Sequence, residues 1–403
     1  MVVQNGSFLI SLRLVLVVFK AGKICDHPVK GMINDYHGAY TDDLIVEILS
    51  RVPAKSLCRF KCVSNHWLTL IDHPNHRKKL PQTLAGFFYT SNDFERLPIS
   101  AHHLATVSGR SCPAIDTSFA FLPNHGQVDL LDCCGGLLLC RWHSVGGDEC
   151  RYIVCNPARE EWVMLPENSN AGMVVGSLCL GFNPAVSSNF LVFVLLKMLM
   201  DQDVDCALSR VDVYSSETGR WVRKGKRWNE DIWLLGPEYM SAVFLNDCMH
   251  FHTYSSTSCH CLAAVDMESE TWTTFPVPHD VYSTGFLQKS QGCLHYSSFQ
   301  TNENHAEVRV MVYVLEDYDN KEWMLKHSVE TSHVSGWTFL NGYLAIHTEC
   351  DLIFFTMERG RHTKFMCYNM NCRQVKVISS LEYGDRPYLP YVPLYAELQS
   401  LQT

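Results

Sequence analysis

The chain of 403 residues lacks an apolar run long enough to cross a membrane. Its most membrane-like stretch, Phe8 to Phe19, is twelve residues long and carries Arg13 in its middle, whereas a transmembrane helix needs roughly 20 apolar residues. Residues 1–7 contain no Lys or Arg, and no small-residue cleavage site follows, so the features of a signal peptide are missing as well. We expect residues 1–38 to be a disordered or poorly ordered leader, and we expect no membrane partner.

The sequence also lacks the motifs of common catalytic and cofactor sites. The patterns H-E-x-x-H, G-x-S-x-G, G-x-G-x-x-G and the Walker phosphate loop are absent. The best metal candidate combines Cys259, His260 and Cys261 with His250 and His252, but it shows none of the paired ligand spacing of structural zinc sites. We therefore expect no catalytic residue, no cofactor and no metal, and we interpret these side chains as buried cysteines and a hydrogen-bonded histidine.

Charge is sparse, at 19% of residues, and its sign is unevenly distributed. Residues 41–80 carry 7 Lys/Arg and 4 Asp/Glu, whereas residues 81–403 carry 22 and 36, a net charge of −14. An acidic body of this size repels phosphate backbones, which argues against nucleic acid or an anionic membrane as a partner. The small basic segment favours an acidic protein partner instead.

Cysteine is too dilute for a disulfide scaffold, with 18 residues in the whole chain. The cysteines are scattered through apolar runs, as small hydrophobic residues are. This usage indicates a reducing compartment, and we expect the protein in the cytoplasm, the nucleus or both.

Helical patterns occupy one short region, residues 41–73. Thr41 is a candidate N-cap of a first helix, in which Asp42 and Asp43 suit the positive end of the helix dipole. Pro53 ends that helix, and Ser64 is a candidate cap for a third one that ends before Pro74. The apolar faces of the three predicted helices comprise Leu44, Ile45, Ile48, Leu49 and Val52; Leu57 and Phe60; and Trp67, Leu70 and Ile71.

From residue 86 onward the sequence reads as short strands broken by turn residues, and it contains an internal repeat. Each unit has a polar residue at the end of a strand and an aromatic residue six positions later, and the intervals between the markers are 59, 51, 51 and 52 residues. The copies are Asn156 to Trp162, Ser215 to Trp221, Asp266 to Trp272, Asp317 to Trp323, and Asn369 to Val375, which has lost the Trp. One tryptophan per unit in constant register indicates packing between units rather than a ligand cage.

A second hairpin precedes most of these markers, at 134–140, 246–252, 291–297 and 341–347. Two hairpins make a four-stranded unit, and a period near 50 residues is typical of propeller blades of the kelch-like length class. The 318 positions from 86 to 403 predict six blades, of which five are visible; five or seven blades, or a pair of β-sandwiches, are the alternatives. The sixth blade would be assembled from residues 86–130 with help from the C-terminus, since closure removes exposed strand edges.

Residues 41–71 resemble the F-box, most closely its flowering-plant form. The matching residues are Asp43, Leu44, Glu47, Ile48, Leu49, Pro53, Leu57, Arg59, Phe60, Val63, Ser64 and Trp67, whereas Tyr40-Thr41 and Asn65 depart from the family pattern. The long C-terminal part is similar to the F-box-associated β-propeller domains of plants, including the segment GFNPAVSSNFLVF at 181–193. The resemblance implies an F-box at 39–80 and a propeller at 86–403, in a multidomain chain with a three-helix α unit followed by an all-β part.

This resemblance implies the substrate-recognition subunit of an SCF-type ubiquitin ligase, which is not itself an enzyme. The F-box would dock on a SKP-type adaptor and, through it, on a cullin, while the propeller would hold an unknown protein substrate. A unit of about forty residues rarely buries so much apolar surface alone, so a partner is expected to cover the excess. The residues expected to bind the adaptor are Leu44, Ile48, Leu49, Val52, Pro53, Leu57, Phe60, Val63 and Trp67.

Two alternatives remain at this level. The apolar face could pack on the propeller. The polar, proline-bracketed linker predicted at 73–82 argues against this packing. The chain could also be a propeller-type sugar-binding module or enzyme with a non-functional F-box. Binding of the adaptor separates the two functions, because such an enzyme has no reason to bind it.

Overall fold

The computed structural model divides the chain into two compact units, 1–83 and 84–403. It describes residues 42–401 except 53–56, 58–59, 62, 78, 81–82, 93–99, 108–114, 148, 170–172, 199–207, 225–231, 235–241, 256–259, 267–272, 279–284, 302–307, 331, 333–343, 360–361 and 383. The predicted leader and the predicted Thr41 cap lie outside these residues.

Short helices form the first unit: α2 (Asp42–Leu49), α4 (Asn65–Asp72) and α5 (Pro74–Arg77). Ser64 caps α4 as predicted, because its hydroxyl accepts a hydrogen bond from the Trp67 backbone N–H at 3.2 Å. Leu57 and Phe60 are helical in the segment expected to form the second helix. The expected linker at 73–82 contributes to this unit instead, since it contains α5 and since Leu80 is buried in the core of the unit.

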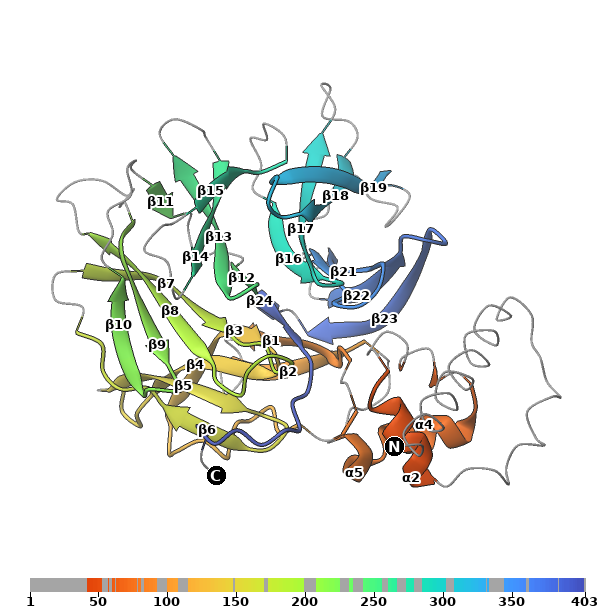
Figure 1. Ribbon diagram of the computed structural model, residues 1–403, viewed down its shortest axis with the longest axis horizontal. Helices are drawn as coiled ribbons and strands as arrows, with labels where there is room; N and C mark the ends of the chain where they lie inside the picture. The colour runs from red at the N-terminus through yellow and green to blue at the C-terminus, as the bar shows by residue number, and fades with distance from the viewer. Residues whose placement is uncertain are drawn as a thin grey trace, which may run out of the picture. The chain divides into compact units, whose positions relative to one another are not determined.

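Six antiparallel sheets make up the second unit, and they form the six-bladed β-propeller predicted from the repeat (Figure 1). The first sheet contains β1 (Gly86–Asn92), β2 (Ser100–Thr106) and β24 (Gly384–Tyr391). The second contains β3 (Gln127–Cys134), β4 (Leu137–His143), β5 (Cys150–Asn156) and β6 (Glu161–Met164), and the third β7 (Met173–Gly181), β8 (Leu191–Met198), β9 (Leu208–Ser215) and β10 (Arg220–Lys224).

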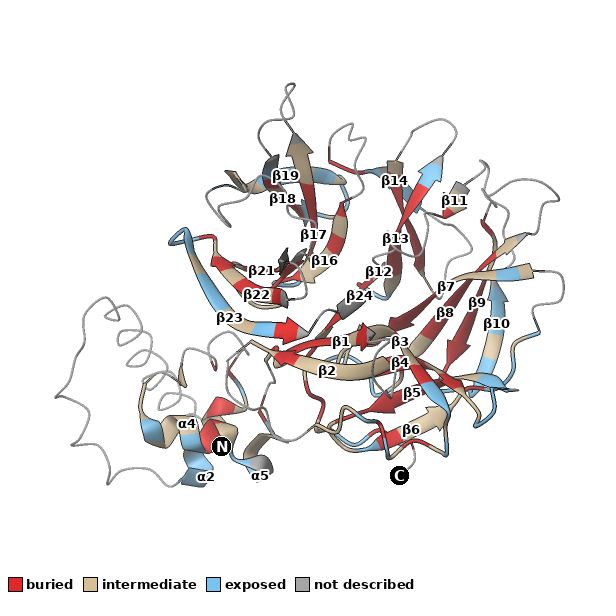
Figure 2. Ribbon diagram, turned by 180° about the vertical axis from the view of Figure 1, so that it is seen from behind, coloured by how far each residue is buried: buried red, intermediate tan, exposed pale blue. Residues whose placement is uncertain are grey.

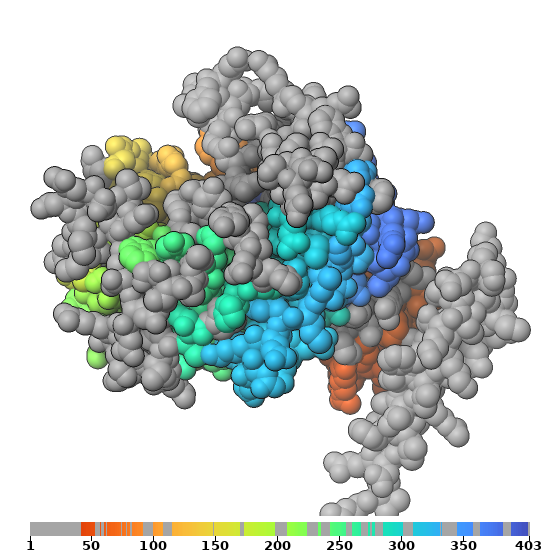
Figure 3. All heavy atoms as spheres, turned by 90° about the horizontal axis from the view of Figure 1, so that it is seen from above, coloured from red at the N-terminus to blue at the C-terminus, as the bar shows by residue number. Residues whose placement is uncertain are grey.

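The remaining three sheets follow in chain order. The fourth contains β11 (Ile232–Leu234), β12 (Ala242–Leu245), β13 (Cys248–Ser255), β14 (His260–Asp266) and β15 (Thr273–Pro276). The fifth contains β16 (Phe286–Ser290), β17 (Cys293–Thr301), β18 (Val308–Asp317) and β19 (Glu322–Glu330), and the sixth β20 (Leu344–Ile346), β21 (Leu352–Arg359), β22 (His362–Asn369) and β23 (Gln374–Glu382). In the space-filling view the later sheets succeed one another from green through cyan to blue (Figure 3).

The inner strands of neighbouring sheets pack against one another in the order β24, β3, β7, β12, β16 and β20. Exposed residues concentrate on outer strands such as β10 and β23, whereas β8 and β9 are largely buried (Figure 2). The C-terminal strand β24 completes the first sheet by pairing with β1, as the closure argument predicts. The predicted extent of that blade was too long, because the strand at 127–134 pairs with β4 and opens the next sheet.

The repeated markers are the turns between the third and fourth strands of the sheets. Asn156 and Asn369 each end a third strand, and their side-chain oxygens accept backbone N–H groups inside the turn, at 3.2 Å from Ala158 and at 2.9 Å from Asn371. The residue four positions after each marker has positive φ: Glu160 at 60°, Gly219 at 65°, Lys321 at 57° and Arg373 at 56°. The repeat therefore reflects one turn geometry. Trp272, the aromatic residue of the third copy, lies outside the described residues.

The marker tryptophans connect neighbouring sheets. The indole N–H of Trp221 donates to the Pro166 carbonyl at 2.8 Å, and that of Trp323 donates to the Pro276 carbonyl at 3.0 Å. Pro166 lies just after β6, and Pro276 is the last residue of β15; each of these strands is the outermost of the preceding sheet. The same position in these two units accounts for their common register, and it confirms the structural interpretation of these two residues.

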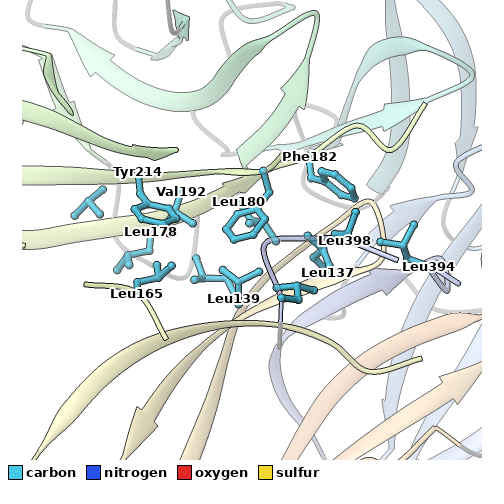
Figure 4. Close-up of a cluster of buried hydrophobic side chains, with 14 of the residues drawn as sticks. Leu137, Leu139, Leu165, Leu178, Leu180, Phe182, Val192, Tyr214, Leu394 and Leu398 are labelled. Carbon is cyan, nitrogen blue, oxygen red and sulfur yellow. The ribbon is translucent and has the colours of Figure 1, made fainter. Parts of the chain in front are cut away.

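Hydrophobic clusters fill the spaces between the sheets. The largest side chains between the second and third sheets interdigitate with the C-terminal tail, whose Leu394, Leu398 and Leu401 are buried (Figure 4). Three predicted second hairpins turn at Gly135–Gly136, Asn246–Asp247 and Gln291–Gly292. The fourth is different, since Leu344–Ile346 is the first strand of its sheet and the chain turns after it, before β21.

Candidate functional site

An apolar surface on the helical unit is the first candidate site. Leu44 is 42% exposed on α2, and Ile48 is half-buried on the same helix. Phe60, Val63 and Trp67 are also half-buried, and the rings of Phe60 and Trp67 meet edge to face with centroids 5.4 Å apart. We call these five residues the helical apolar surface. All five are among the nine side chains expected to bind the adaptor.

Three other expected adaptor ligands lie in the interior of the helical unit. Leu49 and Leu57 are at most 1% exposed and Val52 is 8% exposed. They form one cluster with Val46, Leu70, Ile71 and Leu80, against which Ile45, Phe60 and Trp67 pack. In the free chain these three side chains hold the unit together and offer little surface to a partner. Pro53 lies outside the described residues.

Several basic side chains of the helical unit form ion pairs with acidic side chains of the same unit. The Nζ atom of Lys61 lies 2.9 Å from a carboxylate oxygen of Asp72, and the Arg77 guanidinium lies 3.4 Å from the same oxygen. Arg51 pairs with Glu47 one helical turn away on α2. The net charge of this segment therefore overstates its free positive charge.

The predicted metal candidate divides between different environments. His250 and His252 lie on one face of β13, and both are at most 1% exposed. The His250 ring hydrogen-bonds to the Tyr318 hydroxyl at 2.6 Å, which is the satisfied histidine that the sequence led us to expect. His252 packs on Tyr296, and Cys261 lies 3.0 Å from the Thr253 hydroxyl. Within the described residues, which exclude Cys259, no group of three His, Cys, Asp or Glu residues is placed to hold a metal.

Several histidines of the propeller are buried as neutral side chains. Burial lowers the pKa of His250, of His295 and of His347 from 6.5 to about 4 in each case. Lys326 of the same sheet lies 3.3 Å from the His295 ring, and the Glu349 N–H, two positions along the chain, donates to the His347 ring at 3.0 Å.

One buried carboxylate joins two sheets and was not predicted from the sequence. Asp132 on β3 accepts hydrogen bonds from the Leu180 N–H of β7 and from its neighbour Cys133, both at 2.7 Å. Burial raises its pKa to about 6. Gln288 makes the corresponding link between the fifth and sixth sheets, where its side-chain oxygen accepts the Ile346 N–H at 2.7 Å. Neither contact leaves a signal in the sequence, because the partners are far apart along the chain.

Cys133 and Cys134 are adjacent cysteines on β3, and both are partly buried. Burial raises the pKa of Cys134 to about 12 and that of Cys133 well above its usual range. A thiol that resists ionisation is a poor nucleophile and a poor metal ligand. Among the helices that the structure describes, none is long and apolar enough to span a membrane.

Comparison with known proteins agrees with this architecture. The profile of the F-box domain matches residues 41–79, and that of the "F-box protein At3g26010-like, beta-propeller" family matches residues 109–385. F-box protein At5g07610 of Arabidopsis thaliana is 27% identical over 311 residues, which cover 72% of this chain and 70% of that protein. Putative F-box protein At3g52320 of the same plant is 24% identical over 349 residues, covering 83% and 85%.

Among solved structures, TolB from Acinetobacter baumannii superimposes with a TM-score of 0.47 at 9% identity, covering 79% of this chain and 69% of TolB. The propeller profile alone spans more than half of the chain, and the F-box profile precedes it. The chain therefore belongs to the family of F-box proteins with an At3g26010-like β-propeller.

Proposed function

We propose that this protein is the substrate-recognition subunit of an SCF-type ubiquitin ligase. Its F-box would bind a SKP-type adaptor and thereby a cullin, and its propeller would bind the protein to be ubiquitinated. The chain itself would be non-catalytic, and it would act by raising the effective concentration of the substrate near a conjugating enzyme. We place it in the cytoplasm, the nucleus or both, where such ligases work.

The helical apolar surface is the observation that carries this proposal. The core of the helical unit is complete with Leu49, Val52 and Leu57 inside it, so the exposed Leu44 and the half-buried Ile48 are not needed to close it. Apolar side chains left at the surface of so small a unit favour a protein partner. The family membership supports a SKP-type adaptor as that partner, because F-box domains generally bind SKP adaptors.

Co-purification with a SKP-type adaptor tests the proposal. We expect the double variant Leu44→Ala/Ile48→Ala to lose the adaptor while its circular dichroism spectrum is unchanged. Val145→Ala is the matched control, because Val145 is 63% exposed but lies in the propeller. Wild-type protein that fails to bind the adaptor would contradict the proposal and favour the alternative of a sugar-binding module or enzyme.

A further inference from the structure

A small pocket lies between the third and fourth sheets of the propeller. Its volume is about 140 Å³, and it is bounded by the turns that follow β7, β9 and β12. Pockets that enclose a whole drug-sized ligand are usually about 300 Å³ or larger. The dimensions therefore suit one side chain of a bound protein segment better than a free metabolite.

The floor of the pocket combines an aromatic ring with a hydroxyl. Phe244 of β12 is 7% exposed and lies against Gly181, where a Cβ atom would come within 2.7 Å of its ring. Ser215 is 8% exposed, and it lies on the same face of β9 as Val211 and Val213, which pack between the two sheets. Among the described residues the Ser215 hydroxyl has no hydrogen-bond partner, although it lines the pocket.

Two carboxylates stand at the mouth of the pocket. Glu217 comes from the turn after β9 and Asp247 from the turn after β12, and both are exposed. Neither forms an ion pair with a described residue, and no Lys or Arg lines the pocket. Arg220 lies opposite Ser215 in the β9–β10 ladder, but it is not paired with either carboxylate. The site thus has two negative charges without a cation from the chain.

We propose that this pocket is a subsite for an arginine side chain of the bound protein substrate. The guanidinium is planar, carries five N–H donors and remains charged, so it suits a pocket lined by a hydroxyl and two carboxylates. Its flat face is suited to stacking on the Phe244 ring, and its aliphatic stem is suited to apolar contact with the half-buried Leu191. The acidic body of the propeller adds long-range attraction for such a segment.

Saturation-transfer NMR on the full chain tests this subsite, with N-acetyl-arginine methylamide as the probe. We expect transfer to its methylene protons, and about fivefold weaker transfer at high salt, because the contact depends on charge. The citrulline analogue has the same shape without the charge and should not compete. The proposal is overturned if the citrulline analogue displaces the probe as strongly as excess arginine compound does. It is also overturned if methyl glucoside displaces the probe and neither of the other two compounds does.

The double variant Glu217→Gln/Asp247→Asn should lose the transfer, again by about fivefold or more. Both positions are exposed turn residues, and asparagine accepts the positive φ of Asp247, which is 58°, so the fold should persist in thermal unfolding. Asp319→Asn is the matched control, since Asp319 occupies the position of Glu217 in the corresponding turn of the fifth sheet. Undiminished transfer in the double variant would also overturn the subsite.

The subsite rests on the proposed function, but the two fail separately. If the wild type binds the adaptor and shows no arginine transfer, the pocket has another use and the receptor function stands. If the wild type shows arginine transfer but does not bind the adaptor, the ligase function is wrong while the cation site stands.

Discussion

The buried histidines should make the propeller sensitive to acid, and His347 provides the sharpest test. Burial lowers its pKa from 6.5 to about 4, so between these values the unfolded chain binds a proton that the folded chain does not. Stability is then complete above pH 6.5 and falls as the pH decreases toward 4. At about pH 5.5 the loss from this one histidine is about 1 kcal/mol relative to neutral pH.

The substitution His347→Asn removes this titration, although it also removes the packing of the ring on Phe354. Asparagine can accept the Glu349 N–H hydrogen bond that the His347 ring now accepts at 3.0 Å. We expect urea unfolding, followed by the fluorescence of the nine tryptophans, to show a free-energy loss on acidification about 1 kcal/mol smaller in the variant than in the wild type. Each protein is compared with its own stability at neutral pH, so the direct cost of the substitution cancels.

Asp132 gives an internal control of opposite sign. Its raised pKa of about 6 means that the folded chain gains a proton before the unfolded chain does, so this group stabilises the fold as the pH falls. Asp132→Asn should therefore enlarge the acid loss, by about 1 kcal/mol at about pH 5.5. The reasoning is refuted if His347→Asn changes the acid loss by less than about 0.5 kcal/mol, or if the two variants shift it in the same direction.

The other stability predictions concern packing between sheets and at the tail. Trp323→Phe should lower the free energy of unfolding in urea by about 1 to 2 kcal/mol, because it removes the indole hydrogen bond to Pro276. Met324 on the same strand is 49% exposed, so Met324→Ala should lower it little. Leu398→Ala should cost about 2 to 4 kcal/mol, because Leu398 is 4% exposed in the cluster of the C-terminal tail; a loss no larger than that of the exposed Glu397→Ala would contradict the packing assigned to the tail.

Local chemistry explains what could be predicted from the sequence. The Asx residue at the end of a third strand forms its turn through its own side chain, so the turn is visible in the repeat wherever Asn156, Asp317 or Asn369 stands. Ser64 identifies the start of its helix for the same reason. Period and turn type together were enough to predict the propeller and its six sheets.

Such patterns could not predict contacts between residues that are far apart along the chain. The Asn156 side chain donates to the Leu394 carbonyl at 3.0 Å, across 238 positions of sequence. The hairpin expected at 341–347 begins at residues outside the described part of the chain. An Asn-Gly pair reports only local turn preference, so it could not specify that β20 pairs with β21. On the helical unit, an apolar stripe did not distinguish Leu49, which the unit buries, from Leu44, which it exposes.

The closure of the first sheet by β24 ties the folding of the ring to the completion of synthesis. β1 and β2 leave the ribosome early, but the edge of β1 that receives β24 stays unpaired until residues 384–391 have emerged. A chain terminated prematurely by a nonsense codon would retain this unpaired edge, which is a template for aggregation and a mark for chaperones. The ring therefore closes only after β24 has been synthesised, long after its pairing partner β1.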